Sequence, residues 1–262
     1  MLIALVLITE ILFITAVSLF VFFAIVKDED RVIMRDVLFK GAVGWGVAYF
    51  LRLIPLVLTQ RLIISSLGGY DLKSILALSS RWEVLIVGPI FAGIFEEIVR
   101  FYTIKRSSHI ALDHKVGPIV SGMGWALGEV WLLFSLNAVS AYLQGLNFQV
   151  TIFDILAGLL ERFSTFLAHI ALSFIIFYSF YEIQKVKPSI LLAMLLHFAF
   201  DFIIVIWSLI SSAVSLSSAM FTWGLEFSLF GFALVLILFI RFYVIPRGEG
   251  MYQENMSKLQ ID

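Results

Sequence analysis

Seven apolar runs, most of about twenty residues or more, follow one another along the chain, with short polar breaks between them. Because a hydrocarbon core about 30 Å thick needs roughly 20 apolar residues per helical crossing, each run can span a bilayer. The runs are Leu2–Val26, Val37–Leu58, Trp82–Ile104, Val116–Leu136, Ile152–Tyr181, Ile190–Leu209 and Phe221–Ile245. We therefore expect an all-α, polytopic membrane protein with a single bundle of about seven transmembrane helices.

The composition supports this class and excludes others. Hydrophobic residues make up 61% of the chain and charged residues 14%, whereas soluble domains carry about 25% charged residues. A net charge of -1, from 18 basic and 19 acidic residues, provides no broad basic face, so we expect no nucleic-acid partner. Because the chain has no cysteine, any metal would be held by His, Asp and Glu.

The distribution of basic residues predicts the orientation. Lys and Arg prefer short cytoplasmic loops, and they gather around the first, third and fifth loops and after the last run, at Lys27, Arg31, Arg35, Lys40, Lys105, Arg106, Lys115, Lys185, Lys187, Arg241, Arg247 and Lys258. The second loop, near Lys73, fits less well. We expect a multi-pass protein of the cell membrane with its N-terminus outside and its C-terminus cytoplasmic. No repeat or long linker divides the chain, so residues 1–245 should form one bundle and residues 246–262 a polar cytoplasmic tail.

Ionisable residues inside the apolar runs are the main functional signal. A charge at mid-bilayer costs about 2.5–3.5 kcal/mol on insertion scales, so such residues normally face the bundle interior and mark function. They are Glu96, Glu97 and Arg100 in the third run, Glu129 in the fourth, Asp154, Glu161, Arg162 and His169 in the fifth, and His197 and Asp201 in the sixth. Helical spacing places Arg100 beside both carboxylates of the pair and Asp201 one turn beyond His197.

Four of these residues share one predicted depth. Counted from the nearest loop, Glu97, Glu129, His169 and His197 lie eight to thirteen residues inside their runs, which is roughly 12–20 Å at 1.5 Å per residue. Folding the runs as hairpins brings them into one layer, within residues 91–201. We expect this layer to line a cavity that opens toward the third and fifth loops.

Two imidazoles and several carboxylates, without thiols, form a ligand set suited to zinc in an open catalytic site. A carboxylate of the Glu96/Glu97 pair could then take a proton from the bound water and pass it to a leaving amine, as in metal-assisted peptide hydrolysis. The H-E-x-x-H signature of soluble metalloproteases is absent.

The motif order resembles that of the CAAX-protease-related membrane superfamily, which includes the prenyl-protein endopeptidases, PrsW-type and YhfC-type peptidases and the APH subunit of gamma-secretase. The matching motifs are E-E-x-x-R at Glu96–Arg100, an aromatic-x-x-x-Glu at Trp125–Glu129, a His on the next run, and H-x-x-x-D at His197–Asp201. The resemblance implies that Glu96 or Glu97 is the base that activates water. It also implies that Glu129, His169 and His197 are site or metal-ligand residues, that Asp201 stands where Asn is frequent, and that zinc is a candidate cofactor.

The chain departs from the prenyl-protease form, which has three residues between the Glu pair and Arg and a His where Glu129 stands. Both departures move it toward the PrsW and YhfC forms. The number of runs, the outside N-terminus and the two histidines also resemble the APH subunit, which is regarded as a scaffold.

Three function classes therefore stay open. The first is an intramembrane metallopeptidase that acts on a membrane protein or a lipid-anchored peptide. The second is a scaffold that binds partner membrane subunits, and the third is an ion-coupled transporter with a carboxylate proton relay. Each residue also has a structural reading: the Glu pair with Arg100 as an ion pair, Glu129 as a hydrogen-bonded carboxyl, and the histidines as interhelical partners. Arg162 and Glu161 are expected to pair with each other, and Glu10, Arg52 and Glu226 have no predicted partner.

Overall fold

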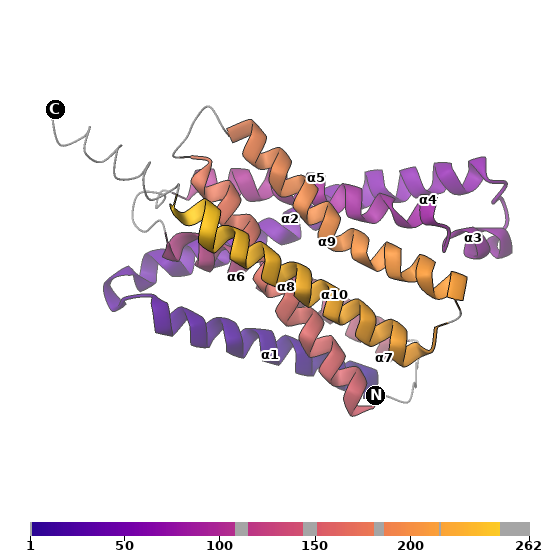
Figure 1. Cartoon of the computed structure of the whole chain (residues 1–262), viewed down its shortest axis with the longest axis horizontal. Coiled ribbons are helices and arrows are strands. Elements are labelled where there is room, and N and C mark those ends of the chain that lie inside the picture. The colour runs from indigo at the N-terminus through magenta and orange to yellow at the C-terminus, as the bar shows by residue number, and fades with distance from the viewer. Residues whose placement is uncertain (1, 108–114, 144–150, 181–185, 215, 247–262) are drawn as a thin grey trace.

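The computed structural model describes residues 2–107, 115–143, 151–180, 186–214 and 216–246. These segments are helical and contain no strand, which confirms the all-α prediction. The longer helices are α1 (Leu2–Ile25), α2 (Arg31–Ser66), α5 (Val87–Arg106), α6 (Val116–Glu129), α7 (Ser135–Leu143), α8 (Ile152–Tyr178), α9 (Val186–Val214) and α10 (Ser218–Phe239). Short helices α3 (Leu72–Leu78) and α4 (Trp82–Leu85) join α2 to α5 at one end of the bundle (Figure 1). Most of the predicted 246–262 tail lies outside the described residues.

Six segments among the described residues are long and apolar enough to cross a membrane: Val6–Ile25, Asp28–Ser66, Val116–Ser140, Ile152–Tyr178, Lys187–Val214 and Ser218–Val244. The protein is therefore a polytopic helical membrane protein. The third predicted run corresponds to α5, which has 20 residues and so is about 30 Å long, but which carries five charged residues. The count of seven crossings stays a prediction that depends on this helix.

Helix α5 lies between α2 and α9 and also contacts α8. Its buried face carries Glu96, Glu97 and Arg100, while Ile90, Ile94 and Ile98 are partly exposed on another face. Charges therefore point into the bundle, where other polar groups can compensate their desolvation.

Glycines allow helix α6 to pack closely against its neighbours. A Cβ built on Gly41 of α2 would lie 2.8 Å from the carbonyl oxygen of Ser121, and one on Gly124 would lie 3.0 Å from Cα of Gly41. A Cβ on Gly122 would meet the backbone of Ile170 on α8. Close helix contact of this kind is typical of small residues in membrane bundles.

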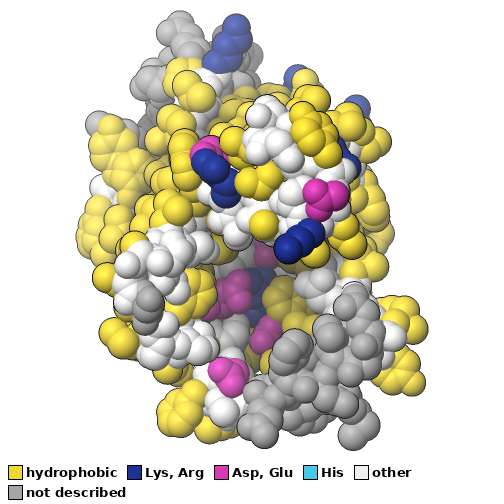
Figure 2. Space-filling view, turned by 90° about the vertical axis from the view of Figure 1, so that its right-hand side faces the viewer, with side chains coloured by type: hydrophobic (Ala, Val, Ile, Leu, Met, Phe, Trp, Pro, Cys, Tyr) yellow, Lys and Arg dark blue, Asp and Glu magenta, His cyan; other side chains and the backbone are white. Residues whose placement is uncertain are grey.

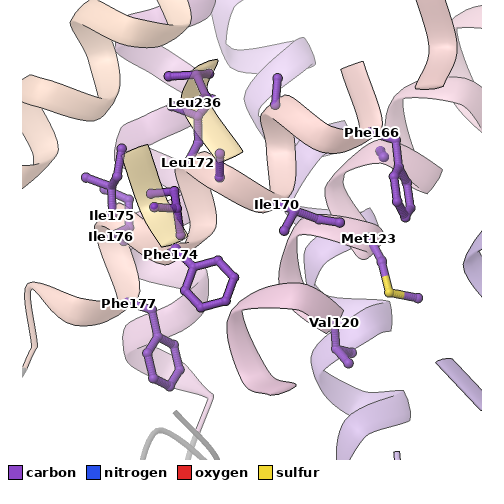
Figure 3. Close-up of a cluster of buried hydrophobic side chains, with 14 of the residues drawn as sticks. Val120, Met123, Phe166, Ile170, Leu172, Phe174, Ile175, Ile176, Phe177 and Leu236 are labelled. Atoms are coloured by element: carbon purple, nitrogen blue, oxygen red, sulfur yellow. The ribbon is translucent and has the colours of Figure 1, made fainter. Parts of the chain in front are cut away.

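A dense apolar cluster packs α6, α8 and α10 together (Figure 3). It includes Val120, Ile170, Phe174 and Phe177, each at most 8% exposed. These side chains pack closely against one another.

Candidate active site

Helix α5 contributes a fully buried ion pair. Nε of Arg100 donates to Oε2 of Glu97 over 2.9 Å, and neither side chain is exposed to solvent. The guanidinium also lies 4.1 Å from the centre of the Trp125 ring, so the indole face covers the cation. The pairing of Glu97 with Arg100 was predicted from the helical spacing, whereas the contact of Arg100 with Trp125 was not. None of the three residues lines the cavity described below.

Arg100 connects α5 to helix α8. Its terminal nitrogens donate to Oγ of Ser173 over 3.0 Å and to Nδ1 of His169 over 2.9 Å. Because a guanidinium only donates, Nδ1 of His169 accepts, and the hydrogen on Nε2 is donated to Oε2 of Glu129 over 2.9 Å. Both ring nitrogens of His169 are therefore occupied.

Glu129 is the last residue of α6, immediately before a π-helical turn at Val130–Phe134. Such turns re-aim side chains and are frequent at functional sites. The other oxygen of Glu129 accepts from Arg162 over 2.8 Å, and Arg162 also pairs with Glu161. The predicted Glu161–Arg162 pair is confirmed, and Glu129 extends it.

His197 of helix α9 joins the Glu pair of α5. Its Nδ1 lies 2.7 Å from Oε1 of Glu97, so the buried carboxylate fixes the ring and directs Nε2 away from it. Nε2 then lies 3.8 Å from Oε2 of Glu96 and 3.8 Å from Oδ2 of Asp201. These distances are too long for direct hydrogen bonds, so three polar atoms surround a small gap.

Glu96 has one paired oxygen and one unpaired oxygen. Oε1 accepts from Arg52 of helix α2, while Oε2 is buried and has no hydrogen-bond partner. The motifs did not predict Arg52 as a site residue, because it stands alone in the second run, and only its charge within an apolar run could have signalled it. The guanidinium of Arg52 lies over the rings of Trp45 and Tyr49.

A cavity of about 440 Å³ lies in front of this cluster. Its charged and histidine side chains come from five helices and are Arg52, Glu96, Glu129, Glu161, Arg162, His169, His197 and Asp201. Apolar side chains such as Leu53, Leu56 and Val205 complete the walls. Glu97 and Arg100 do not line the cavity, so Glu96 is the member of the pair that can meet a ligand.

The cavity opens at the end opposite to the one we predicted. Its lining extends to Leu56 on α2, Leu85 on α4 and Ser208 on α9, all toward the second and sixth loops. Seen from the end of the bundle that carries α3 and α4, the molecule is hollowed, with acidic and basic side chains in the hollow (Figure 2). The prediction of access from the third and fifth loops was wrong, because the cavity extends toward the second and sixth loops and is lined by neither Phe174 nor Phe177, which are buried in the apolar cluster.

The three expected zinc ligands, Glu129, His169 and His197, do not form a ligand set in this conformation. The rings of His169 and His197 lie 5.9 Å apart, but both nitrogens of His169 are engaged and Nδ1 of His197 is held by Glu97. The described residues contain no group of three or more His, Asp or Glu side chains arranged to hold a metal ion. Zinc therefore stays a prediction, and no chemical step is assigned to it below.

The remaining intramembrane charges lie outside the Glu96 cluster. Asp154 caps the start of α8 together with Thr151, in agreement with its expected place near the fourth loop. Glu10 of α1 lies beside Gly158, and Glu226 of α10 is 5% exposed with one unpaired oxygen. Neither lines the cavity.

Comparison of the chain with family models, with curated proteins and with solved structures finds no match.

Proposed function

We propose that this protein is an intramembrane peptidase that hydrolyses peptide bonds of a membrane protein or a lipid-anchored peptide with a water activated by Glu96. The observation that carries the proposal is the unpaired Oε2 of Glu96, buried at the cavity wall and facing Nε2 of His197. A free carboxylate oxygen next to a fixed imidazole can accept a proton from water, as a general base must. The motif resemblance to the CAAX-protease-related superfamily points to the same residues.

The proposed reaction adds one water across one C–N bond. Glu96 accepts a proton from the water as its oxygen bonds to the peptide carbonyl carbon, and the same proton passes to the leaving amine when the C–N bond breaks. Nε2 of His197 holds the water or the carbonyl oxygen, and Oδ2 of Asp201 lies 3.8 Å from that nitrogen. Glu97 is a positioning residue, since it acts through the ring of His197.

Arg52 has a separate role in this proposal. Its guanidinium donates to Oε1 of Glu96 and so fixes the position of the carboxylate. It also leaves Oε2 as the free basic atom. Peptide segments would reach the site from the side of the second, fourth and sixth loops, the non-cytoplasmic side in the proposed orientation.

The test is hydrolysis in ¹⁸O-labelled water by the purified protein in lipid bilayers, with candidate membrane proteins and lipid-anchored peptides as substrates. Mass spectrometry should find one ¹⁸O atom in the new carboxylate of the product. Glu96→Gln should form no product, whereas Glu83→Gln, which alters a partly exposed carboxylate paired with Arg81 outside the cavity, should behave as wild type. Equal product from Glu96→Gln would overturn the role of Glu96.

A scaffold resembling the APH subunit is the second candidate. The chain of bonds from Glu97 through Arg100 and His169 to Glu129 joins α5, α6 and α8 with nearly every polar atom paired, as a purely structural network would be. If the protein is a scaffold, the Glu96→Gln variant should still bind a partner membrane protein, and the wild type should cleave no substrate.

A further inference from the structure

A second hollow lies on the flank of the bundle, between helices α2 and α5, and the proposed peptidase site does not use it. It is a groove of about 520 Å³. Its lining is Phe39, Lys40, Val43, Gly44, Val47, Val99, Tyr102, Thr103 and Arg106. None of these residues lines the cavity of the candidate active site.

The groove is polar at one end and apolar at the other. On α2, Lys40, Val43 and Val47 follow helical spacing, and on α5, Val99, Tyr102 and Arg106 do the same. The two helices are neighbours and run antiparallel, because Gln60 bonds to Val84 while Gly44 lies beside Thr103. The early Lys40 of α2 and the final Arg106 of α5 therefore lie at the same end. From this cationic end the groove runs about 10 Å along α2 to Val47, at 1.5 Å per residue.

The floor of the groove depends on a glycine. A Cβ built on Gly44 would lie 2.8 Å from Oγ1 of Thr103, so any side chain there would fill the space between the helices. The walls are Val43 and Val47, each nearly half exposed, and the rim is formed by the more exposed Phe39 and Tyr102. Apolar walls open to the outside of a membrane bundle are in contact with lipid.

The cationic end is available to an anion. Lys40 is bonded to Asp36 over 2.5 Å, but no carboxylate among the described residues pairs with Arg106. Lys105 is exposed beside it, so positive charge exceeds negative charge at this end. The same end of the bundle carries the basic first and third loops, where the bilayer leaflet is expected to be anionic.

We propose that this groove binds one phospholipid with an anionic headgroup. The headgroup phosphate would lie between Lys40 and Arg106, and one acyl chain would follow Val43 and Val47 toward the bilayer centre. The groove has positive charge at one end and apolar walls beyond it, and a phospholipid has its charged headgroup at one end and its acyl chains beyond it, so the two match along their length. Basic sites between transmembrane helices on the cytoplasmic side bind such headgroups in general.

The test compares lipids that share their acyl chains. Delipidated, full-length protein in neutral detergent is titrated with phosphatidylglycerol, with phosphatidylcholine, or with inorganic phosphate, and bound molecules are counted by native mass spectrometry. Wild type should retain one phosphatidylglycerol about tenfold more tightly than phosphatidylcholine, and phosphate alone should not be retained. If the protein retains inorganic phosphate alone, the ligand of the groove is a free anion and the lipid proposal is wrong.

Two variants separate the headgroup from the chain. The double change Lys40→Gln and Arg106→Gln should remove the tenfold preference for phosphatidylglycerol, since each of the two basic residues contributes a similar share of the binding free energy of the anionic headgroup. Val43→Trp should fill the groove and weaken the binding of both lipids. The matched control, Arg61→Gln with Lys73→Gln, removes two exposed cations at the other end and should behave as wild type. An unchanged preference in the Lys40/Arg106 variant, or loss in the control, would overturn the proposal.

Discussion

Nδ1 of His197 and Oε1 of Glu97 lie 2.7 Å apart, so a buried carboxylate on α5 fixes the ring of a histidine on α9. The other oxygen of Glu97 accepts from Arg100, which continues to His169 and Ser173 on α8. Glu96, one residue earlier, faces the cavity instead. The two glutamates of the pair therefore have different environments, and their substitutions should differ in kind.

Glu96→Gln is expected to affect mainly the cleavage rate, and Glu97→Gln mainly the stability of the fold. Glu96→Gln should reduce the cleavage rate by 10²–10⁴-fold, because a general base is removed, with a smaller change in stability. Glu97→Gln should lower the free energy of unfolding by about 3–5 kcal/mol, because it leaves Arg100 as a buried charge without its counter-ion. Initial rates and denaturant unfolding measured on the same preparations decide this. A stable, inactive Glu97→Gln together with an active Glu96→Gln would exchange the two roles.

Zinc binding is expected to depend on His197. The ion would have to take Nε2 of His197, which has no direct hydrogen bond within 3.5 Å among the described residues, because both nitrogens of His169 are occupied. Zinc titration of the purified protein, followed by metal analysis, should give one ion per chain in wild type and none in His197→Ala. The control is Glu83→Gln, which should keep the metal. If zinc-free wild type cleaves its substrate at the full rate, the reaction does not require the metal.

Single cysteines should report the orientation and the side from which the cavity opens, because the chain has none of its own. Ser80→Cys in the second loop and Ser208→Cys on the cavity wall should react with an impermeant thiol reagent added outside intact cells. Glu29→Cys in the first loop should react only in opened cells. Ser164→Cys, at a fully buried position of α8, is the unreactive control. Labelling of Glu29→Cys but not Ser80→Cys in intact cells would invert the topology.

Two glycines should respond to alanine with opposite signs. Gly124→Ala should destabilise the protein by about 1–3 kcal/mol, because its Cβ would meet the backbone of Leu38 and Gly41. Gly231→Ala on α10, with open space around the new methyl group, should be neutral or stabilise by up to about 1 kcal/mol through helix propensity. Thermal unfolding in the same detergent compares them. Equal effects would mean that α6 does not pack on α2 in this way.

The sequence predicted the helices and the depth of the polar layer, but not which side chains pair. Apolar runs and their charged interruptions are local patterns, so Glu97, Glu129, His169 and His197 could be assigned to one layer by counting residues from the loops. The bond between Arg52 and Glu96 joins residues 44 positions apart, and no local pattern contains it. The open end of the cavity was missed because it depends on how side chains of different helices pack, with Phe174 and Phe177 buried in the apolar cluster.

Backbone contacts at the glycines of α6 restrict how this molecule can move. Gly124 and Gly128 lie against the backbone of α2, and Gly122 lies against that of α8. No side chain stands between these backbones that could change rotamer, so α6 cannot slide or tilt without separating from both neighbours. The close backbone contacts therefore hold Glu129 of α6 and His169 of α8 in fixed register with each other.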